Sequence, residues 1–344
     1  YSNDPFIVQI KVKDGSTTLA DSETFGISGG TYQTVTTDLV VEHNTLNYST
    51  ATIELILEGD SKRGGYYGPE TNAVNLTMAY GTAKQNGDLF INAGTDGAVG
   101  GNLSITATTG NITDTTALTV GGTSSFRTLA NNADIVLDQA SNAFSGAVSL
   151  NTTGSSSHVK IDGGTTALII AQSSVGGQLH LISGHASGIT DSGTVTVGSW
   201  FSATTDANNG VINLDQLAVS SDIYFTTHGT GNATGVNAST FHFGANNSGM
   251  TVGGNLSVTS TTGDITDGWG NATHTVAGTT TLTTSANNRT ITLDNTNNAF
   301  TGALTITTND NSGTDADVTI DAGTTALILA ASTIDGDLTV RSGN

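Results

Sequence analysis

The sequence predicts an all-β fold: a parallel β-helix, or β-solenoid, of stacked coils that follows a small β-rich module or cap. Three observations lead to this prediction. Short motifs recur at a spacing of 76 or 77 residues along most of the chain. Apolar residues alternate with small polar ones at the strand period of two. Only 11% of the residues are charged, and Gly, Ser, Thr and Asn fill most other polar positions, a composition that suits short strands joined by tight turns.

The repeat has two parts. Its first part reads Gly-Gly-Asn-Leu-Ser-Ile from Gly100, and related motifs begin at Gly176 and Gly253. Its second part reads Ile-Thr-Asp and follows each of these motifs at a constant distance. Repetition of this kind marks an architecture in which one unit stacks on the next. We expect turns or corners at the recurring positions Gly101, Gly177, Gly254, Asp114, Asp191 and Asp267.

Composition divides the chain near residue 86. Residues 1–86 hold all five Glu and both Pro, and we interpret them as a small β-rich module or as irregular first coils that cap a solenoid. Residues 87–344 contain neither residue type. The predicted solenoid blocks lie near residues 100–175, 176–252 and 253–335, and a truncated fourth block follows. Because the chain stops a few residues into that block, we expect it to be a piece of a longer protein.

Each block contains too many strand-like segments for one coil. Three or four coils of about 19–26 residues fit its length, with each strand paired to strands in the coils on either side. Inward positions such as Leu103, Ile105, Ile135 and Leu137 would then stack into apolar ladders. No long segment has the period of a helix.

The motifs resemble the repeats of large bacterial exoproteins of the filamentous-haemagglutinin type. The resemblance rests on Gly-Gly-Asn-Leu-Ser-Ile, Ile-Thr-Asp, Asp-Ile-Val-Leu-Asp at residues 134–138 and Asn-Ala-Phe-Ser-Gly-Ala at residues 142–147. It covers about residues 87–344. It implies a right-handed parallel β-helix, secretion, and a role as a surface adhesin or fibre.

Charge and composition exclude several classes of partner and cofactor. The net charge of −20 repels nucleic acid and anionic membrane surfaces, so neither is an expected partner. The absence of Cys rules out disulfides and thiolate metal sites. No apolar stretch is long enough for a transmembrane helix. We expect no cofactor.

Metal binding and catalysis find little support in the sequence. In a solenoid the repeated aspartates would lie three or four coils apart, about 14–19 Å, too far to share one ion. Asp310, Asp315 and Asp317 form the one local acidic group and are weak candidates for a cation site. Basic residues are scattered and the seven His show no metal-ligand spacing, so we predict no catalytic residues and no enzyme.

Trp200 with Phe201, and Trp269, are the aromatic positions that a sugar could stack on, although packing in the core or at a corner is the favoured interpretation. The leading hypothesis is a structural, secreted β-solenoid of a bacterial surface adhesin or filament, which associates with itself or presents a binding face, for example to cell-surface glycans. The alternative is a β-helix that binds carbohydrate or processes polysaccharide.

Overall fold

The chain is an all-β parallel β-solenoid, as the repeat pattern predicts. The computed structural model describes residues 6–14, 16–21, 25–27, 51–58, 70–77, 88–92, 98–244, 249–268, 270, 272–310 and 314–343. Residue contacts divide the chain into unit 1, Tyr1–Thr166, and unit 2, Ala167–Asn344. The described residues contain only strands and turns, and none of them forms a helix that is long and apolar enough to span a membrane.

Unit 1 contains fourteen strands. They are β1 (Phe6–Asp14), β2 (Thr17–Asp21), β3 (Phe25–Ile27), β4 (Ala51–Glu58), β5 (Glu70–Thr77), β6 (Asp88–Asn92), β7 (Ala98–Ala107), β8 (Ile112–Asp114), β9 (Thr119–Val120), β10 (Ser124–Asn131), β11 (Ile135–Leu137), β12 (Ala143–Phe144), β13 (Val148–Thr153) and β14 (Val159–Asp162). Antiparallel pairing joins β1 to β2, β3 and β4. From β4 and β5 onward, strands pair in parallel with those of the next coil.

The predicted boundary at residue 86 lies among residues 78–87, outside the described part of the chain. The strands nearest to it are β5 on one side and β6 on the other. Both belong to parallel pairs, β5 with β7 and β6 with β4 and β8. Coil-like pairing in unit 1 therefore includes strands from both sides of that boundary.

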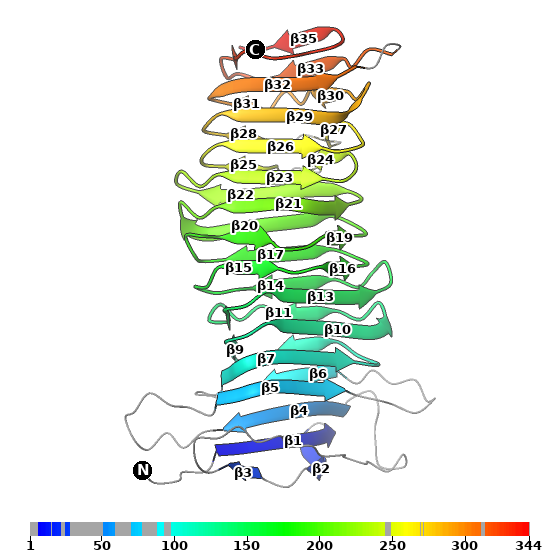
Figure 1. Cartoon of the computed structure of the whole chain (residues 1–344), viewed down its shortest axis with the longest axis vertical. Coiled ribbons are helices and arrows are strands. Elements are labelled where there is room, and N and C mark those ends of the chain that lie inside the picture. Colours follow the sequence, from blue (N-terminus) through cyan, green and yellow to red (C-terminus); the bar gives the residue numbers. More distant parts are fainter. Residues whose placement is uncertain are drawn as a thin grey trace. The chain divides into compact units, whose positions relative to one another are not determined.

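Each coil of unit 1 consists of one long strand and two short ones, as in β10, β11 and β12. The long strands β7, β10 and β13 stack in parallel, and so do the short strands β8, β11 and β14. Ile105, Phe126 and Leu150 lie in register and are at most 1% exposed. The predicted apolar ladders are therefore confirmed: inward side chains of successive coils pack on one another (Figure 1).

Unit 2 contains the remaining strands. They are β15 (Leu168–Ile170), β16 (Ser173–Val175), β17 (Leu179–Ser183), β18 (Ile189–Asp191), β19 (Val195–Val197), β20 (Phe201–Asn208), β21 (Ile212–Val219), β22 (Asp222–His228), β23 (Ala233–Asn237), β24 (Phe241–Phe243), β25 (Thr251–Val252), β26 (Leu256–Ser260), β27 (Ile265–Asp267), β28 (Thr275–Val276), β29 (Thr280–Asn287), β30 (Ile291–Leu293), β31 (Ala299–Phe300), β32 (Ala303–Asn309), β33 (Val318–Asp321), β34 (Ile328–Leu329) and β35 (Leu338–Arg341). All their pairings are parallel (Figure 1).

Equivalent motifs in unit 2 lie in opposite sheets. Strands β17, β20, β22 and β24 stack in one sheet, so Leu179 is followed in register by Phe201, Ile223 and Phe243. Leu256, the counterpart of Leu179, lies in the other sheet, with β18, β21 and β23. The repeat from Leu179 to Leu256 therefore spans about three and a half coils. The prediction of three or four coils holds in length, but a repeated residue does not stack on its own counterpart.

Asparagines form three of the corners. Asn132, Asn209 and Asn288 have φ angles of 61°, 64° and 60°, in the left-handed region that Asn tolerates better than most residues. Each follows another Asn at the end of a long strand, β10, β20 or β29. The expectation that Asn occupies corners with left-handed backbone is confirmed at these three positions.

Candidate binding face

The repeated aspartates connect successive coils. Asp114, Asp191 and Asp267 end the short strands β8, β18 and β27, and their carboxylates accept backbone N–H groups one coil further on. Asp114 accepts from Asp138 (3.2 Å), Asp191 from Asp215 (3.1 Å) and Gln216 (2.9 Å), and Asp267 from Asp294 (3.2 Å) and Asn295 (2.8 Å). Each carboxylate thus satisfies backbone donors where the following coil turns.

Two of these aspartates also bind a buried asparagine. Nδ2 of Asn142 donates to Oδ2 of Asp114 at 2.7 Å, and Nδ2 of Asn298 donates to Oδ2 of Asp267 at 2.9 Å. Burial raises the pKa of Asp114 and of Asp267, and the hydrogen bonds that each carboxylate accepts oppose that rise. These contacts lie within the wall of the solenoid and tie neighbouring coils together.

The repeated glycines contribute backbone carbonyls at the same kind of position. Gly101 accepts the N–H of Gly122 (2.8 Å), Gly177 that of Ser199 (3.1 Å) and Gly254 that of Gly278 (2.9 Å). Each bond joins a motif to the next coil.

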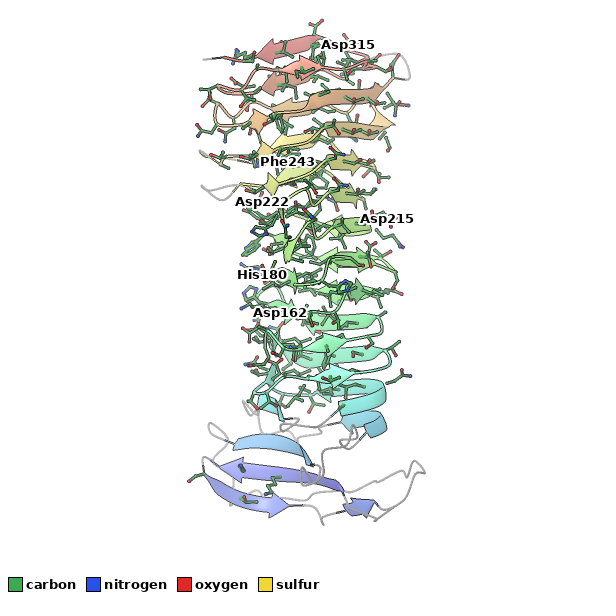
Figure 2. All side chains as sticks on the ribbon, turned by 90° about the vertical axis from the view of Figure 1, so that its left-hand side faces the viewer. Asp162, His180, Asp215, Asp222, Phe243 and Asp315 are labelled. Carbon is green, nitrogen blue, oxygen red and sulfur yellow. The ribbon has the colours of Figure 1, made fainter. Side chains whose placement is uncertain are left out.

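The weak cation candidates lie near the C-terminal end of unit 2. Oδ1 of Asp317 accepts the N–H of Asp337 at 2.8 Å, while Asp310 and Asp315 are exposed. Figure 2 shows Asp315 at that end of unit 2. Residues 311–313, between them, are outside the described residues. In the described part of the chain, no group of three or more His, Asp or Glu is arranged to hold a metal ion.

One outer face of unit 2 gathers aromatic and ionisable side chains. We call the five residues His180, Trp200, Asp222, Tyr224 and His242 the aromatic cluster. His180 lies on β17, Trp200 directly precedes β20, Asp222 and Tyr224 lie on β22, and His242 lies on β24. All five are half-buried, and the residues that alternate with them are fully buried: Leu179, Phe201, Ile223, Phe225 and Phe243. The strand period thus turns the cluster toward solvent.

Strand register brings the cluster together from four coils. His180, Ser202 and Tyr224 lie opposite one another on successive strands, and Asp222 lies opposite His242. The ring centroid of Trp200 is 4.4 Å from that of His180 and 5.7 Å from that of Tyr224, at interplanar angles of 81° and 76°. Three rings therefore follow one another edge to face. Figure 2 shows His180 and Asp222 on the same side of unit 2 and Asp215 on the opposite side.

Polar contacts accompany the rings. The Oη of Tyr224 donates to Oδ2 of Asp222 at 3.5 Å. The Oγ of Ser202 is 3.0 Å from Nδ1 of His180, and the Oγ1 of Thr266 is 2.6 Å from Nδ1 of His242. Burial raises the pKa of Asp222, and His242 opposes that shift. The face thus combines aromatic surface with hydroxyl, carboxyl and imidazole groups.

Comparison with known proteins assigns the repeat. The family model described as "Repeats of unknown function (DUF5649)" matches residues 72–151, 156–220 and 230–307. The chain belongs to this family. No curated protein and no solved structure matches it. The first DUF5649 match begins at residue 72, in strand β5.

The DUF5649 repeats of this chain differ at the cluster. In the blocks that begin at Gly100 and Gly253, strand for strand, small residues occupy most of the equivalent outward positions. Ser104 and Ser257 correspond to His180, Thr123 and Thr279 to Trp200, Ala147 and Ala303 to Asp222, Ser149 and Thr305 to Tyr224, and Lys160 and Thr319 to His242. The coil forms with Ser, Thr or Ala at these sites, so stacking of DUF5649 repeats does not require the cluster.

Sequence reasoning identified one member of the cluster, Trp200. Phe201, considered together with it, points inward and packs on Phe225 at a centroid distance of 6.5 Å. Trp269 lies outside the described residues. The signal that would have found His180, Tyr224 and His242 is the comparison of outward positions between DUF5649 repeats, where large side chains replace small ones only in the middle block.

Proposed function

We propose that this chain is a structural, extracellular β-solenoid of a bacterial surface adhesin or filament, whose outer face binds a partner and which performs no catalysis. One observation carries the proposal. The coils of this chain form with small polar side chains outside, yet one face of unit 2 replaces them with the aromatic cluster. Aromatic side chains on an outer face indicate recognition, because a partner can cover their apolar surface.

Three further properties support an adhesive role over a catalytic one. The chain belongs to a family of repeats, and its motifs resemble those of filamentous-haemagglutinin-type exoproteins. Its charge of −20 favours solubility of a long β protein outside the cell. The basic residues Arg127, Lys160, Arg289 and Arg341 are exposed and separated along the described chain, and Lys160 pairs with Asp138 at 2.9 Å.

Surface display tests this function. The full chain, presented on a bacterium that does not adhere, is expected to increase attachment to host-cell monolayers, relative to display of an unrelated β-solenoid of similar charge. Equal attachment for both proteins would contradict the adhesive role. Release of reducing ends from polysaccharides by the purified chain, lost on substitution of one Asp, would favour the polysaccharide-processing alternative.

Self-association is the second part of the proposal. We propose that copies of the chain associate end to end or side by side, because strand edges readily pair with other strands. Sedimentation velocity over a range of protein concentrations should show species larger than the monomer. A single monomeric species at all concentrations would contradict self-association and leave the attachment assay to judge the binding face.

A further inference from the structure

We propose that the aromatic cluster is a binding site for a neutral glycan chain, with Trp200 and Tyr224 as the surfaces on which sugar rings stack. This inference rests on the proposed adhesive function and names the chemical class of its ligand. It is argued from the arrangement of the rings, the polar groups beside them, the charge of the chain and the glycine beneath Tyr224.

The rings form a row instead of a cage. His180, Trp200 and Tyr224 lie on three successive coils, so the row extends over two strand spacings, roughly 10 Å. Aromatic cages that bind a single cation surround it with ring faces. Here the rings lie edge to face along one side of a sheet, which leaves a long open surface. Such a surface fits an extended ligand that has several flat apolar patches.

Polar groups border the row on the next strand. Asp222 lies beside Tyr224, and His242 is opposite Asp222 on β24. A sugar ring presents C–H groups on its faces and hydroxyl groups along its edge. The faces can pack on Trp200 and Tyr224, while the hydroxyl groups exchange hydrogen bonds with carboxyl and imidazole atoms. Ligand sites commonly combine apolar contact with a few polar groups that set orientation.

Charge selects against acidic glycans. The chain carries a net charge of −20, and the cluster adds the carboxylate of Asp222. No Lys or Arg belongs to the cluster, and its two histidines are neutral over most of the range above their ordinary pKa. A sulfated or carboxylated polysaccharide would therefore meet repulsion that is not balanced locally. A neutral hexose chain meets none.

Gly244 supports the position of Tyr224. Gly244 follows β24 and its N–H donates to the carbonyl of Ile223 at 3.1 Å. A β carbon at residue 244 would collide with Cε1 and Cδ1 of the Tyr224 ring. The ring therefore lies across the backbone of the neighbouring coil, in space that only glycine leaves open. Gly244 is a positioning residue, since it acts on a ligand only through Tyr224.

The test measures binding of neutral hexose oligosaccharides. Cello-, manno-, galacto- and malto-oligosaccharides are titrated into the full chain, with chondroitin sulfate and choline as the anionic and cationic probes. The chain has two Trp, so a Trp269→Phe background makes Trp200 the sole fluorescent reporter. At least one neutral oligosaccharide is expected to bind and to shift Trp200 emission. Binding of only chondroitin sulfate or choline, or of no probe, would overturn the inference.

Variants taken from the chain's own repeats keep the fold. Trp200→Thr and Tyr224→Thr introduce residue types found at equivalent strand positions, and each is expected to weaken binding about tenfold or more. Gly244→Ala should weaken binding less than Tyr224→Thr does. Thr281→Ala, on the opposite sheet, is the control and should bind like the parent. Unchanged affinity of both aromatic variants would overturn the site.

The attachment assay separates this inference from the function on which it rests. If Trp200→Thr abolishes glycan binding and reduces cell attachment, both stand. If the displayed parent chain attaches to cells but binds no neutral oligosaccharide, the glycan assignment is wrong and the adhesive function stands. If the parent chain does not attach at all, the proposed function is wrong, whatever the oligosaccharide titration gives.

Discussion

The side chains of Asp114 and Asn142 meet across one coil: Nδ2 of Asn142 donates to Oδ2 of Asp114 at 2.7 Å, although the two residues are 28 positions apart. Asp114 is 3% exposed and Asn142 1%. The same contact recurs between Asp267 and Asn298. Two motifs that recur separately in the sequence are therefore one structural device, a polar contact that joins a short strand to the following turn.

Removal of this contact should destabilise the solenoid. Asp114→Ala leaves the amide of Asn142 and the N–H of Asp138 with one acceptor fewer, and we expect a loss of about 1–3 kcal/mol in the free energy of unfolding. Denaturant titration followed by far-ultraviolet circular dichroism measures it. Asp191→Ala is the matched control, because Asp191 is less buried and accepts only backbone donors among its printed contacts. An equal or larger loss for Asp191→Ala would contradict the role given to the Asp114–Asn142 contact.

The left-handed corner at Asn209 should tolerate glycine better than a β-branched residue. Its φ is 64°, and its Oδ1 accepts the N–H of Thr230 at 2.8 Å. Asn209→Val is expected to cost about 2–3 kcal/mol, from strained backbone and the lost bond. Asn209→Gly loses only the bond, about 1 kcal/mol. Asn213→Val, on the exposed side of β21, should change stability by less than about 0.5 kcal/mol. Similar midpoints for Asn209→Val and Asn213→Val would refute strain at the corner.

His274 should make the solenoid sensitive to acid. The side chain is fully buried, its Nδ1 accepts the N–H of Met250 at 3.1 Å, and its ring packs on Phe243 at 5.3 Å. Burial lowers the pKa of His274 from 6.5 to about 4. Between these values the unfolded chain binds the proton and the folded chain does not. Stability is therefore complete above pH 6.5 and falls as the pH approaches 4, by about 2 kcal/mol at pH 5.

The equivalent residues Leu118 and Val195 are apolar and buried, so His274→Leu is a fitting replacement. Thermal unfolding of the parent and His274→Leu should be compared at pH 7 and pH 5. The gap between them should shift toward the Leu variant at pH 5. Comparing the two proteins cancels the opposite contribution of Asp114 and Asp267, whose raised pKa values stabilise the fold at low pH. Parallel pH profiles would show that His274 does not titrate on unfolding.

How much of this fold the sequence could predict depends on which interactions are local. The alternation of Leu103 and Ile105 with polar residues identifies inward positions, because a strand repeats every two residues. The coil count is different. Three, three and a half or four coils all fit 77 residues, and only strand pairing shows that Leu179 and Leu256 face opposite ways.

The cluster could not be assembled from sequence for the same reason. The coil steps from His180 to Ser202 and from Asp222 to His242 differ in length, 22 and 20 residues, so no constant period aligns the outward residues. A one-residue change in register would turn a side chain from the outer face into the core. Trp200 was recognisable as an aromatic residue, but its neighbours Tyr224 and His180 follow from register alone.

Gly235 shows a core position where the hydrophobic pattern fails, and it gives a further prediction. It lies in register with Leu214 and Val258, so an inward apolar side chain is expected. The rings of Phe225 and Phe241 fill that space instead, and a β carbon at residue 235 would lie 2.8 Å from Phe225 and 3.0 Å from Phe241. Both rings are fully buried, which leaves them little room to move.

Gly235→Ala should therefore overpack the core and cost about 1–3 kcal/mol in denaturant unfolding. The smaller side chain of Phe225→Leu opens space beside the new methyl group, although alone it leaves a cavity. The double variant Gly235→Ala/Phe225→Leu should lose less stability than the sum of the two single variants, since each change relieves the other. Additive losses would mean that the Phe225 ring does not fill the space left by Gly235, and that glycine is needed there for its backbone alone.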